Sequence, residues 1–441
     1  MRAVASIRAG RGGGQNPVNV GIVIGRIGDV DGVALETEKW IEVLDRLGHT
    51  CFVLSGRFRE HVVPLERETS FRPLSFFSPQ CEWEQNRAFF FPPDDPDELL
   101  TTMDENAQDV ASEIFRWVVA NKIDVLISEN ASSLPCHLSM GLGIKLAAEG
   151  MSLPVITHDH DFAWERGDRY ATPFPEVEEL IAASFPLRLP HVSHAVINSA
   201  AREELESRYG ICAAVIPNVM DFEAEYAKQD GYNGDLLSSI GIGNGDLPIF
   251  QITRIVKRKG IETAIDLVRR LDDRRVRLVI TGSAADDDRK GYFKELVEKI
   301  EAAKLQDRVT FAYHKILSKR EQVSNGRKIY SLEDAYAHAV AVTYFSTYEG
   351  FGNAFLEAVL ARKPVFVNNY EPVFWPDIGS KGFDTVMLES GVLTDEAVGQ
   401  IDTILHDPER QREIAEHNFT LGRRHFSYDV LEEKLAALLE F

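Results

Sequence analysis

The sequence predicts an α/β protein made of two doubly wound domains with a cleft between them. Short apolar runs alternate with amphipathic helical segments, which is the pattern of parallel sheets covered by helices on both faces. The alternation stops at residues 226–246, where Gly, Asn and Asp are frequent, and then starts again. At 441 residues the chain also exceeds the size that one hydrophobic core usually supports.

These breaks divide the chain into five predicted segments. Residues 1–16 contain Arg and Gly without the apolar stretch of a signal peptide, so we expect a flexible tail there. The segments are the tail 1–16, an N-terminal Rossmann-like domain 17–225, a linker 226–246, a C-terminal domain 247–424, and a C-terminal helix 425–441 that could pack back on the N-terminal domain.

Periodicity places the elements in order. Apolar runs predict strands, and apolar positions recurring every three to four residues predict helices. The predicted strands are 18–24, 51–54, 125–128, 155–157, 195–197, 215–219, 248–253, 277–281, 309–312, 339–345 and 364–367. One predicted helix ends near Leu47, and another contains the apolar residues Ile114, Trp117 and Val118. The other main predicted helices cover 200–209, 260–271, 289–303 and 428–439. Residues 55–97 show no clean period and are expected to form loops and short elements.

Composition excludes several classes of function. The formal charge of −21 argues against nucleic acid or an acidic membrane surface as a partner, because both repel an acidic protein. Four scattered cysteines without a CxxC pair suit a reducing cytoplasm and give no metal or disulfide signal. No apolar run reaches about 18 residues, so no membrane span is expected. We therefore expect a cytoplasmic protein whose anionic ligands must be met by local cations.

Residues 345–365 predict a ligand pocket at the start of a helix. Gly350 and Gly352 let the backbone approach a ligand, and Asn353 is expected to cap the helix that follows. A helix N-terminus favours an anion such as a diphosphate. Glu357 is the one carboxylate in the apolar segment 354–361, where the vicinal hydroxyls of a ribose would give it a partner. An ordinary loop followed by a solvated Glu explains this stretch equally well, so other segments must decide.

Two Gly-containing loops follow predicted strands in the two halves. The first, at residues 25–33, includes Gly32 and suits a phosphate, but such loops are common in α/β proteins. The second, at 253–260, carries Arg254, Lys257, Arg258 and Lys259, which suit a diphosphate leaving group. A solvated basic turn is the alternative for this second loop.

A third loop, at 157–166, has the sequence THDHDFAWER. Its alternating His and Asp residues resemble a metal box, but no distant third ligand can be identified, so no metal is expected. His160 next to carboxylates could instead contact a sugar hydroxyl or act in acid–base chemistry.

Together these segments resemble the retaining glycosyltransferases of family 4, which are two-domain enzymes of the GT-B fold. Glu349 and Glu357 match the family's E-x7-E motif, and Arg254 and Lys259 resemble its pair of cations for the donor diphosphate. His160-Asp161 and the turn IPNVMD at 216–221 are similar to two further motifs, although Val-Met replaces the usual Gly-Val in that turn. The resemblance spans residues 18 to about 440.

A narrower resemblance links HDHDFAWER to the HHHDFYWER-type segment of the mannosylglucosylglycerate synthases within this family. His158-Asp159 stands where those proteins have a His-His pair, which leaves the acceptor open. Phe345-Ser346 replaces the usual Pro-Ser before the donor loop, at a strand end where it should matter little.

The resemblance implies transfer of a mannosyl or glucosyl group, with retention, from a nucleoside diphosphate sugar to a small hydroxylated acceptor such as glucosylglycerate. GDP-mannose is the favoured donor and UDP-glucose the alternative, with no metal or other cofactor required and no side chain acting as nucleophile. By this resemblance, Glu357 would bind the ribose of the donor, and Glu349 and His160 would contact its hexose. Arg254 and Lys259 would bind the diphosphate, and the loop at Gly32 would approach the β-phosphate. The N–H groups of Phe351, Gly352 and Asn353 would contact sugar and phosphate.

The acceptor is expected at residues 158–170 of the N-terminal domain. Arg166 and Arg169 suit a carboxylate, because a guanidinium holds it with two parallel hydrogen bonds. Trp164 could stack on a sugar, and His158 lies at the start of the segment. Pairing of both arginines with surface acids such as Glu165 or Asp168 is the alternative.

Two other functions remain open for the sequence. A nucleotide-sugar 2-epimerase of the same fold would form product from the donor alone, and a non-catalytic nucleotide-sugar-binding protein would leave the donor intact. The two motif glutamates together with Arg254 and Lys259 favour catalysis. The base, the hexose, the acceptor and the oligomeric state are not determined by the sequence.

Overall fold

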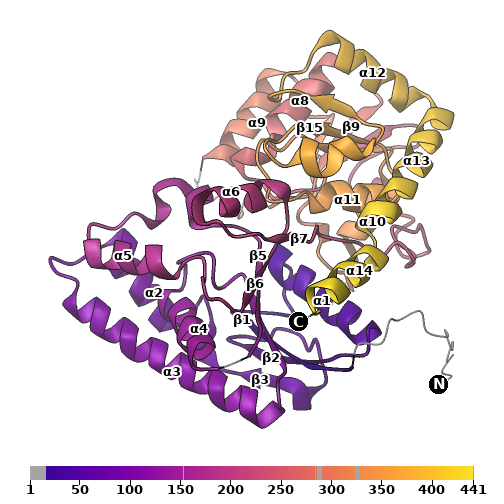
Figure 1. Ribbon diagram of the computed structural model, residues 1–441. Helices are drawn as coiled ribbons and strands as arrows, with labels where there is room; N and C mark the ends of the chain where they lie inside the picture. The colour runs from indigo at the N-terminus through magenta and orange to yellow at the C-terminus, as the bar shows by residue number, and fades with distance from the viewer. Residues whose placement is uncertain (1–15, 152, 284, 286–290, 323–327, 441) are drawn as a thin grey trace. The chain divides into compact units, whose positions relative to one another are not determined.

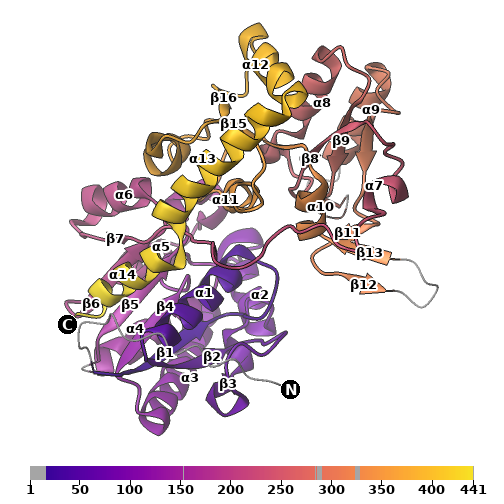
Figure 2. The same cartoon turned by 90° about the vertical axis from the view of Figure 1, so that its right-hand side faces the viewer.

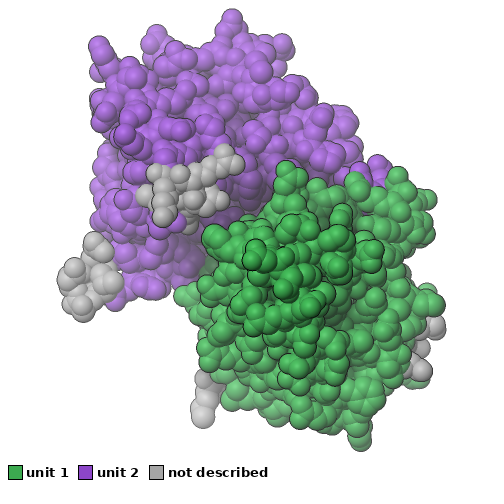
Figure 3. All heavy atoms as spheres, turned by 90° about the vertical axis from the view of Figure 1, so that its left-hand side faces the viewer, with its two compact units in different colours: residues 1–196, 205–214, 431–441 green, residues 197–204, 215–430 purple. Residues whose placement is uncertain are grey.

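The computed structural model describes residues 16–151, 153–283, 285, 291–322 and 328–440, so residues 1–15 of the expected tail lie outside the described residues. The chain forms two compact units, distinguished by colour in Figure 3. Unit 1 holds the described residues up to Val196, together with Leu205–Ala214 and the chain from Leu431 onward. Unit 2 holds Ile197–Glu204 and Val215–Val430.

Unit 1 is built on a seven-stranded sheet with the strand order β3-β2-β1-β4-β5-β6-β7 (Figure 1). The ladders from β3 to β6 are parallel. The strands are β1 (Asn19–Ile24), β2 (Thr50–Ser55), β3 (Glu68–Ser70), β4 (Val125–Glu129), β5 (Val155–Asp159), β6 (Val192–Val196) and β7 (Ala214–Val215).

The helices of unit 1 pack their apolar positions on this sheet. Val23 and Leu126 of the sheet share one buried cluster with Ile114 and Trp117 of α3 and with Ile144 of α4. The helices are α1 (Gly32–Arg46), α2 (Pro79–Gln85), α3 (Asp97–Asn121), α4 (Leu138–Gly150) and α5 (Pro175–Ser184), with short helical turns η1 (Leu65–Arg67), η2 (Arg72–Leu74), η3 (Asn86–Phe90) and η4 (Ala163–Tyr170). The division between the units falls within α6 (Ser199–Tyr209) and α14 (Tyr428–Leu438).

Unit 2 contains a six-stranded parallel sheet with the order β10-β9-β8-β14-β15-β16. A separate three-stranded sheet, β11-β13-β12, is visible in Figure 2. The strands are β8 (Leu247–Gln251), β9 (Val276–Ile280), β10 (Val309–Phe311), β11 (Ile316–Leu317), β12 (Glu321–Gln322), β13 (Lys328–Ser331), β14 (Ala341–Tyr344), β15 (Val365–Asn368) and β16 (Val386–Leu388).

Both faces of the six-stranded sheet are buried. The neighbours Ile249 and Phe250 of β8 belong to different apolar clusters, because successive side chains of a strand point to opposite faces. The covering helices include α8, which contributes Ile265 to one cluster, and α11, which contributes Phe355 to the other. The helices are α7 (Leu236–Ser239), α8 (Ile261–Arg270), α9 (Tyr292–Ala302), α10 (Leu332–His338), α11 (Asn353–Leu360), α12 (Asp395–His406) and α13 (Pro408–Phe426), with turns η5 (Lys257–Lys259), η7 (Phe374–Ile378) and η8 (Gly379–Lys381).

Each of the two large sheets has one point where the strand order reverses, between β1 and β4 in unit 1 and between β8 and β14 in unit 2. Doubly wound sheets bind ligands beside the carboxyl ends of the strands at such a point. Three of the four loops singled out in the sequence, those after β1, β8 and β14, begin there, and the fourth follows β5 beside β4. The topology therefore gathers the candidate residues at one end of each sheet.

The structure differs from the sequence-based expectation in two segments near the boundary between the expected domains. The stretch 226–246, expected to be a linker, lies inside unit 2, where Leu236 is fully buried and the Asn233 side chain donates to Asp334 at 2.7 Å. Its Gly, Asn and Asp residues form turns packed on the core, which composition alone does not distinguish from a linker. The strand expected at 215–219 is limited to Ala214–Val215. Within the described residues, no helix is both long enough and apolar enough to cross a bilayer.

Candidate active site

A buried ion-pair cluster lies at the strand reversal of unit 2. Glu349, which follows β14, is 8% exposed and pairs with Lys259 through one carboxylate oxygen and with Arg258 at 2.8 Å through the other. Both cations follow β8, the neighbouring strand. Burial would raise the pKa of Glu349, but Lys259 and Arg258 outweigh it and lower that pKa, so the carboxylate is ionised.

Backbone contacts hold the same two loops together. The Arg258 guanidinium also donates to the Tyr348 carbonyl at 2.8 Å, and the Thr347 N–H donates to the Arg258 carbonyl at 2.7 Å. Gly260 has φ +60°, and a Cβ there would lie 2.1 Å from the Phe345 carbonyl oxygen. The approach of these two loops therefore requires glycine at position 260.

The start of α11 has no side-chain cap. Its N-cap is Gly352, with φ +143°. The expectation that Asn353 caps this helix is wrong, because Asn353 is the first helical residue and its Oδ1 accepts a hydrogen bond from Asn218 at 2.8 Å. A Cβ at Gly352 would lie 2.1 Å from the Tyr370 hydroxyl, which donates to the Phe351 carbonyl. The Tyr370 hydroxyl thus fixes the peptide between Phe351 and Gly352, and no side chain caps this helix start.

Two buried asparagines outside the expected set hold this loop. Asn198 donates to the Gly350 carbonyl at 2.8 Å, and Asn218 binds Asn353. Asn218 lies in the IPNVMD turn already singled out, whereas nothing in the sequence near Asn198 signals its contact with a loop about 150 residues later.

Glu357 has a tyrosine partner. It is half-buried on α11, and the fully buried Tyr336 of α10 donates its hydroxyl to Glu357 Oε2 at 2.9 Å. Burial, followed by the charge of Glu357, raises the pKa of Tyr336 well above its usual value, so this hydroxyl remains a donor. The carboxylate predicted in an apolar helix segment is therefore oriented by a neutral donor.

Arg254, by contrast, is an exposed side chain with no hydrogen bond or ion pair to any residue in the described part of the chain. It lies close enough to Lys259 to help lower the pKa of that amine, although burial is the main cause. The structure thus brings Lys259 and Arg258 to Glu349 and leaves Arg254 beside them facing solvent.

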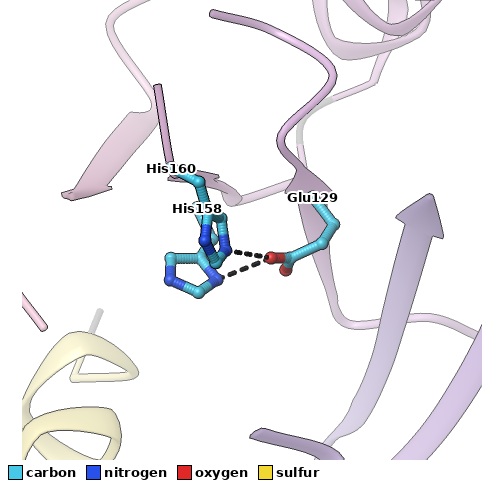
Figure 4. Close-up of side chains that lie close together, drawn as sticks. All are labelled: Glu129, His158 and His160. Atoms are coloured by element: carbon cyan, nitrogen blue, oxygen red, sulfur yellow. Dashed lines mark hydrogen bonds and ion pairs between the residues drawn. The ribbon is translucent and has the colours of Figure 1, made fainter. Parts of the chain in front are cut away.

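In unit 1, Glu129, His158 and His160 form a second cluster (Figure 4). Glu129 ends β4 and is the register partner of His158 on β5, and His160 follows two residues later. Glu129 Oε1 lies 2.7 Å from His158 Nδ1 and 3.1 Å from His160 Nε2. Glu129 was not among the expected site residues, because only the pairing of β4 with β5 brings it to the histidines.

Burial and the two imidazoles act oppositely on Glu129. Burial would raise its pKa, but His158 and His160 outweigh burial and lower it to about 2. His158 also stacks on the buried Trp40 with ring centroids 3.9 Å apart. Glu129 is therefore a buried carboxylate held ionised between two histidines.

The opposite face of β5 carries a polar set of its own. The Thr157 hydroxyl donates to Asp159 at 2.8 Å and lies 3.0 Å from His194 Nδ1 on β6. Burial raises the pKa of Asp159 to about 7 and lowers that of His194 to about 4. His194 is thus neutral in the folded protein near neutral pH, whereas Asp159 titrates in that range.

The helix start in unit 1 is already occupied by a carboxylate. Asp31 caps α1 by accepting from the N–H groups of Val33 and Ala34 at 3.1 Å, and Arg26 pairs with Asp31 at 2.9 Å. Gly32 is the first residue of this helix. A phosphate would meet a capping carboxylate at this helix end, unlike at the start of α11.

The residues expected to bind an acceptor already have contacts within unit 1. Arg166 pairs with Asp161, and the Arg169 guanidinium lies over the rings of Phe90 and Tyr170. Trp164 stacks on the buried Phe162 with ring centroids 4.4 Å apart, and the Arg208 guanidinium lies over the Trp164 ring. Both Arg166 and Arg169 remain exposed.

Comparison with known proteins matches this chain to one family. The model of glycosyl transferases group 1 matches residues 236–419. The chain is 32% identical to a mannosylglucosylglycerate synthase of Thermotoga maritima over 95% of this chain and 99% of the relative, and 29% identical to one of Petrotoga mobilis over 93% and 98%. A glycosyltransferase structure from Rickettsia africae aligns with a TM-score of 0.65 at 14% identity, covering 96% of this chain and 98% of that one.

Gly260→Ala tests the close approach of the loops after β8 and β14. The new Cβ meets backbone, so we expect a loss of about 1–3 kcal/mol in unfolding free energy beyond the cost of the positive φ. Gly241→Ala is the matched control, because Gly241 has φ +82° and no atom within 4 Å of its Cβ position. Equal losses in denaturant titrations of the two variants would contradict the steric argument.

His194→Asn tests the buried neutral imidazole. The lowered folded-state pKa means that the unfolded chain binds the extra proton as pH falls from 6.5 towards 4, so His194 should cost up to about 3 kcal/mol of stability across that window. Asp159 acts in the opposite direction, because its folded-state pKa is raised. The measurement is therefore the difference in unfolding free energy between wild type and variant against pH. Parallel profiles would refute the assignment.

Proposed function

Because this chain belongs to the group 1 glycosyl transferases, which are retaining hexosyltransferases, and has their GT-B fold, we propose that it transfers a mannosyl group from GDP-mannose to glucosylglycerate. The near full-length similarity to two mannosylglucosylglycerate synthases supports this choice of donor and acceptor. The observation that carries the proposal is the uncapped start of α11 beside a buried cation cluster at the strand reversal of unit 2.

In this proposal the donor diphosphate binds between that helix start and the cations after β8. Free N–H groups and the helix dipole attract an anion, and each close cation adds charge-assisted hydrogen bonds. Arg254 has an exposed side chain with no ion pair among the described residues, so it can turn to a phosphate without leaving a buried acid unpaired. Lys259 binds phosphate while its contact with Glu349 holds the amine in place.

The motif glutamates have separate tasks in the same scheme. Glu349 is kept ionised close to the helix start and contacts the hexose, and Glu357 accepts hydrogen bonds from the ribose hydroxyls while Tyr336 orients it. His160 and the loop at Gly32 are assigned to the hexose and the β-phosphate by resemblance to the family. Departure of the diphosphate is promoted by charge neutralisation, so unit 2 needs no metal for that step.

The acceptor is assigned to the segment 158–170 of unit 1. In an acidic protein, the exposed guanidinium groups of Arg166 and Arg169 are the local cations that a glycerate carboxylate requires. Binding would exchange the Asp161 carboxylate on Arg166 for that of the acceptor. Trp164 is assigned to contact the acceptor sugar, and His158, which is fully buried against Trp40, to support this segment.

Product analysis tests the proposal directly. GDP-mannose and UDP-glucose are each incubated with the protein in the presence and absence of glucosylglycerate, and the products are followed by NMR. We expect an α-linked mannoside only with GDP-mannose and acceptor together. Conversion of the donor sugar without acceptor would indicate a 2-epimerase, and an intact donor under all conditions would indicate a binding protein.

Arg254→Ala tests the diphosphate site. We expect turnover to fall by about 10²-fold, as is common when one electrostatic contact to the transition state is lost. Lys257→Ala is the matched control, because Lys257 is an exposed cation on the same turn that pairs with Glu262 and Glu295. Normal turnover in Arg254→Ala, or an equal loss in both variants, would count against a specific diphosphate contact.

Glu357→Gln tests the ribose contact while keeping an acceptor for Tyr336. We expect GDP-mannose binding to weaken by about 1–3 kcal/mol in calorimetric titrations, since the hydroxyls lose a charged acceptor. Tyr336→Phe reports how much of that effect comes from orientation alone. An unchanged donor dissociation constant in Glu357→Gln would remove the ribose role.

Arg166→Ala tests the acceptor carboxylate. The Michaelis constant for glucosylglycerate should rise at least about tenfold, the effect of losing a charged hydrogen bond, with donor affinity unchanged. Arg116→Ala serves as control, because Arg116 is an exposed arginine of unit 1 paired with Glu113. Equal use of glucosylglycerate and its methyl ester by the wild type would exclude a carboxylate contact.

A further inference from the structure

The cluster of Glu129, His158 and His160 offers three metal-ligating groups that the proposed transfer does not require as a set. One ligand atom from each residue lies within 4.8 Å of the others (Figure 4). They come from the adjacent carboxyl ends of β4 and β5, with all three side chains gathered at one place. Glu129 is therefore the third candidate ligand, distant along the chain, that the sequence did not reveal.

Some buried polar atoms of this cluster have no hydrogen-bond partner among the described residues. His158 Nδ1 lies 2.7 Å from Glu129 Oε1, yet the contact lacks the geometry of a hydrogen bond. Glu129 Oε2 is also buried without a hydrogen-bond partner among the described residues. Unpaired buried polar atoms are costly, and a cation bound between the carboxylate and the imidazoles would satisfy both atoms.

The surroundings hold the three groups in place before any ligand binds. Trp40 stacks on the His158 ring and fixes its plane. The Asn130 N–H donates to the His158 carbonyl at 2.8 Å, and Asn130 Oδ1 accepts from the His160 N–H at 3.0 Å. Such outer contacts orient metal ligands and reduce the cost of binding.

We propose that Glu129, His158 and His160 form a binding site for a first-row divalent transition metal such as Zn²⁺ or Co²⁺. Two imidazole nitrogens with one carboxylate suit these ions better than Mg²⁺ or Ca²⁺, which prefer oxygen ligands. Bonds of about 2.0 Å in a tetrahedron separate ligand atoms by about 3.3 Å, so the Glu129 carboxylate must shift by a few tenths of an ångström from its present contacts.

Three protein ligands leave a coordination position for water or a substrate oxygen. This site belongs to unit 1, whereas the cations assigned to the diphosphate belong to unit 2. Metal binding therefore tests this site separately from the donor diphosphate site, although His158 and His160 also have assigned roles in the proposed function.

Metal titration of the purified full chain without a polyhistidine tag tests the proposal. The chelator-treated protein is titrated with Co²⁺, followed by visible ligand-field absorption and calorimetry, and then with Zn²⁺ in competition. We expect one Co²⁺ per chain, displaced by Zn²⁺, with affinity reduced at least about tenfold in Glu129→Gln and in His160→Asn. His61→Asn is the matched control, because His61 is an exposed histidine whose Nδ1 also lies 2.8 Å from a carboxylate, that of Glu68.

Several outcomes would overturn the site. These are no binding by the wild type, equal binding by wild type, Glu129→Gln and His160→Asn, or loss of binding in His61→Asn. If the buried variants do not fold, X-ray absorption of the wild-type Co²⁺ protein decides. Two imidazoles with oxygen ligands support the site, and sulfur ligands or fewer than two imidazoles refute it.

Discussion

The buried pairing of Glu349 with Lys259 and Arg258 is the interaction on which the candidate donor site depends. A buried carboxylate without partners is strongly destabilising, so Glu349 can occupy its position only when the turn after β8 lies against the loop after β14. The contact between Gly260 and Phe345 and the hydrogen bond from Thr347 to Arg258 make that approach possible. Charge and backbone geometry thus fix the same pair of loops.

The two strand reversals have similar topology but different chemistry. In unit 2 the helix after the central loop starts without a side-chain cap and lies beside cations, which suits a polyanionic ligand. In unit 1 Asp31 caps the helix after β1, and Glu129 and two histidines lie at the carboxyl ends of β4 and β5. The repeated fold therefore supplies two positions for ligands, and local side chains decide what each can bind.

The loop before α11 is held by residues far away in the sequence. Asn198 and Asn218 bind Gly350 and Asn353, and both asparagines belong to unit 2 although they precede its sheet in the chain. Tyr336 and Tyr370 complete the support by donating to Glu357 and to the Phe351 carbonyl. All four supports are buried side chains from outside the loop, so tertiary contacts and not its own sequence position it.

The sequence by itself determined the alternation of strands and helices, the family and the positions of Glu349, Glu357 and the basic turn, because these depend on local periodicity and on short motifs. It also predicted most strands of the two large sheets within a few residues. It misassigned the cap of α11 and the stretch 226–246, since the same polar residues form caps, turns and linkers. Only the tertiary structure joined Glu129 to His158 and Arg258 to Glu349, because strand pairing brings together residues that have no relation along the chain.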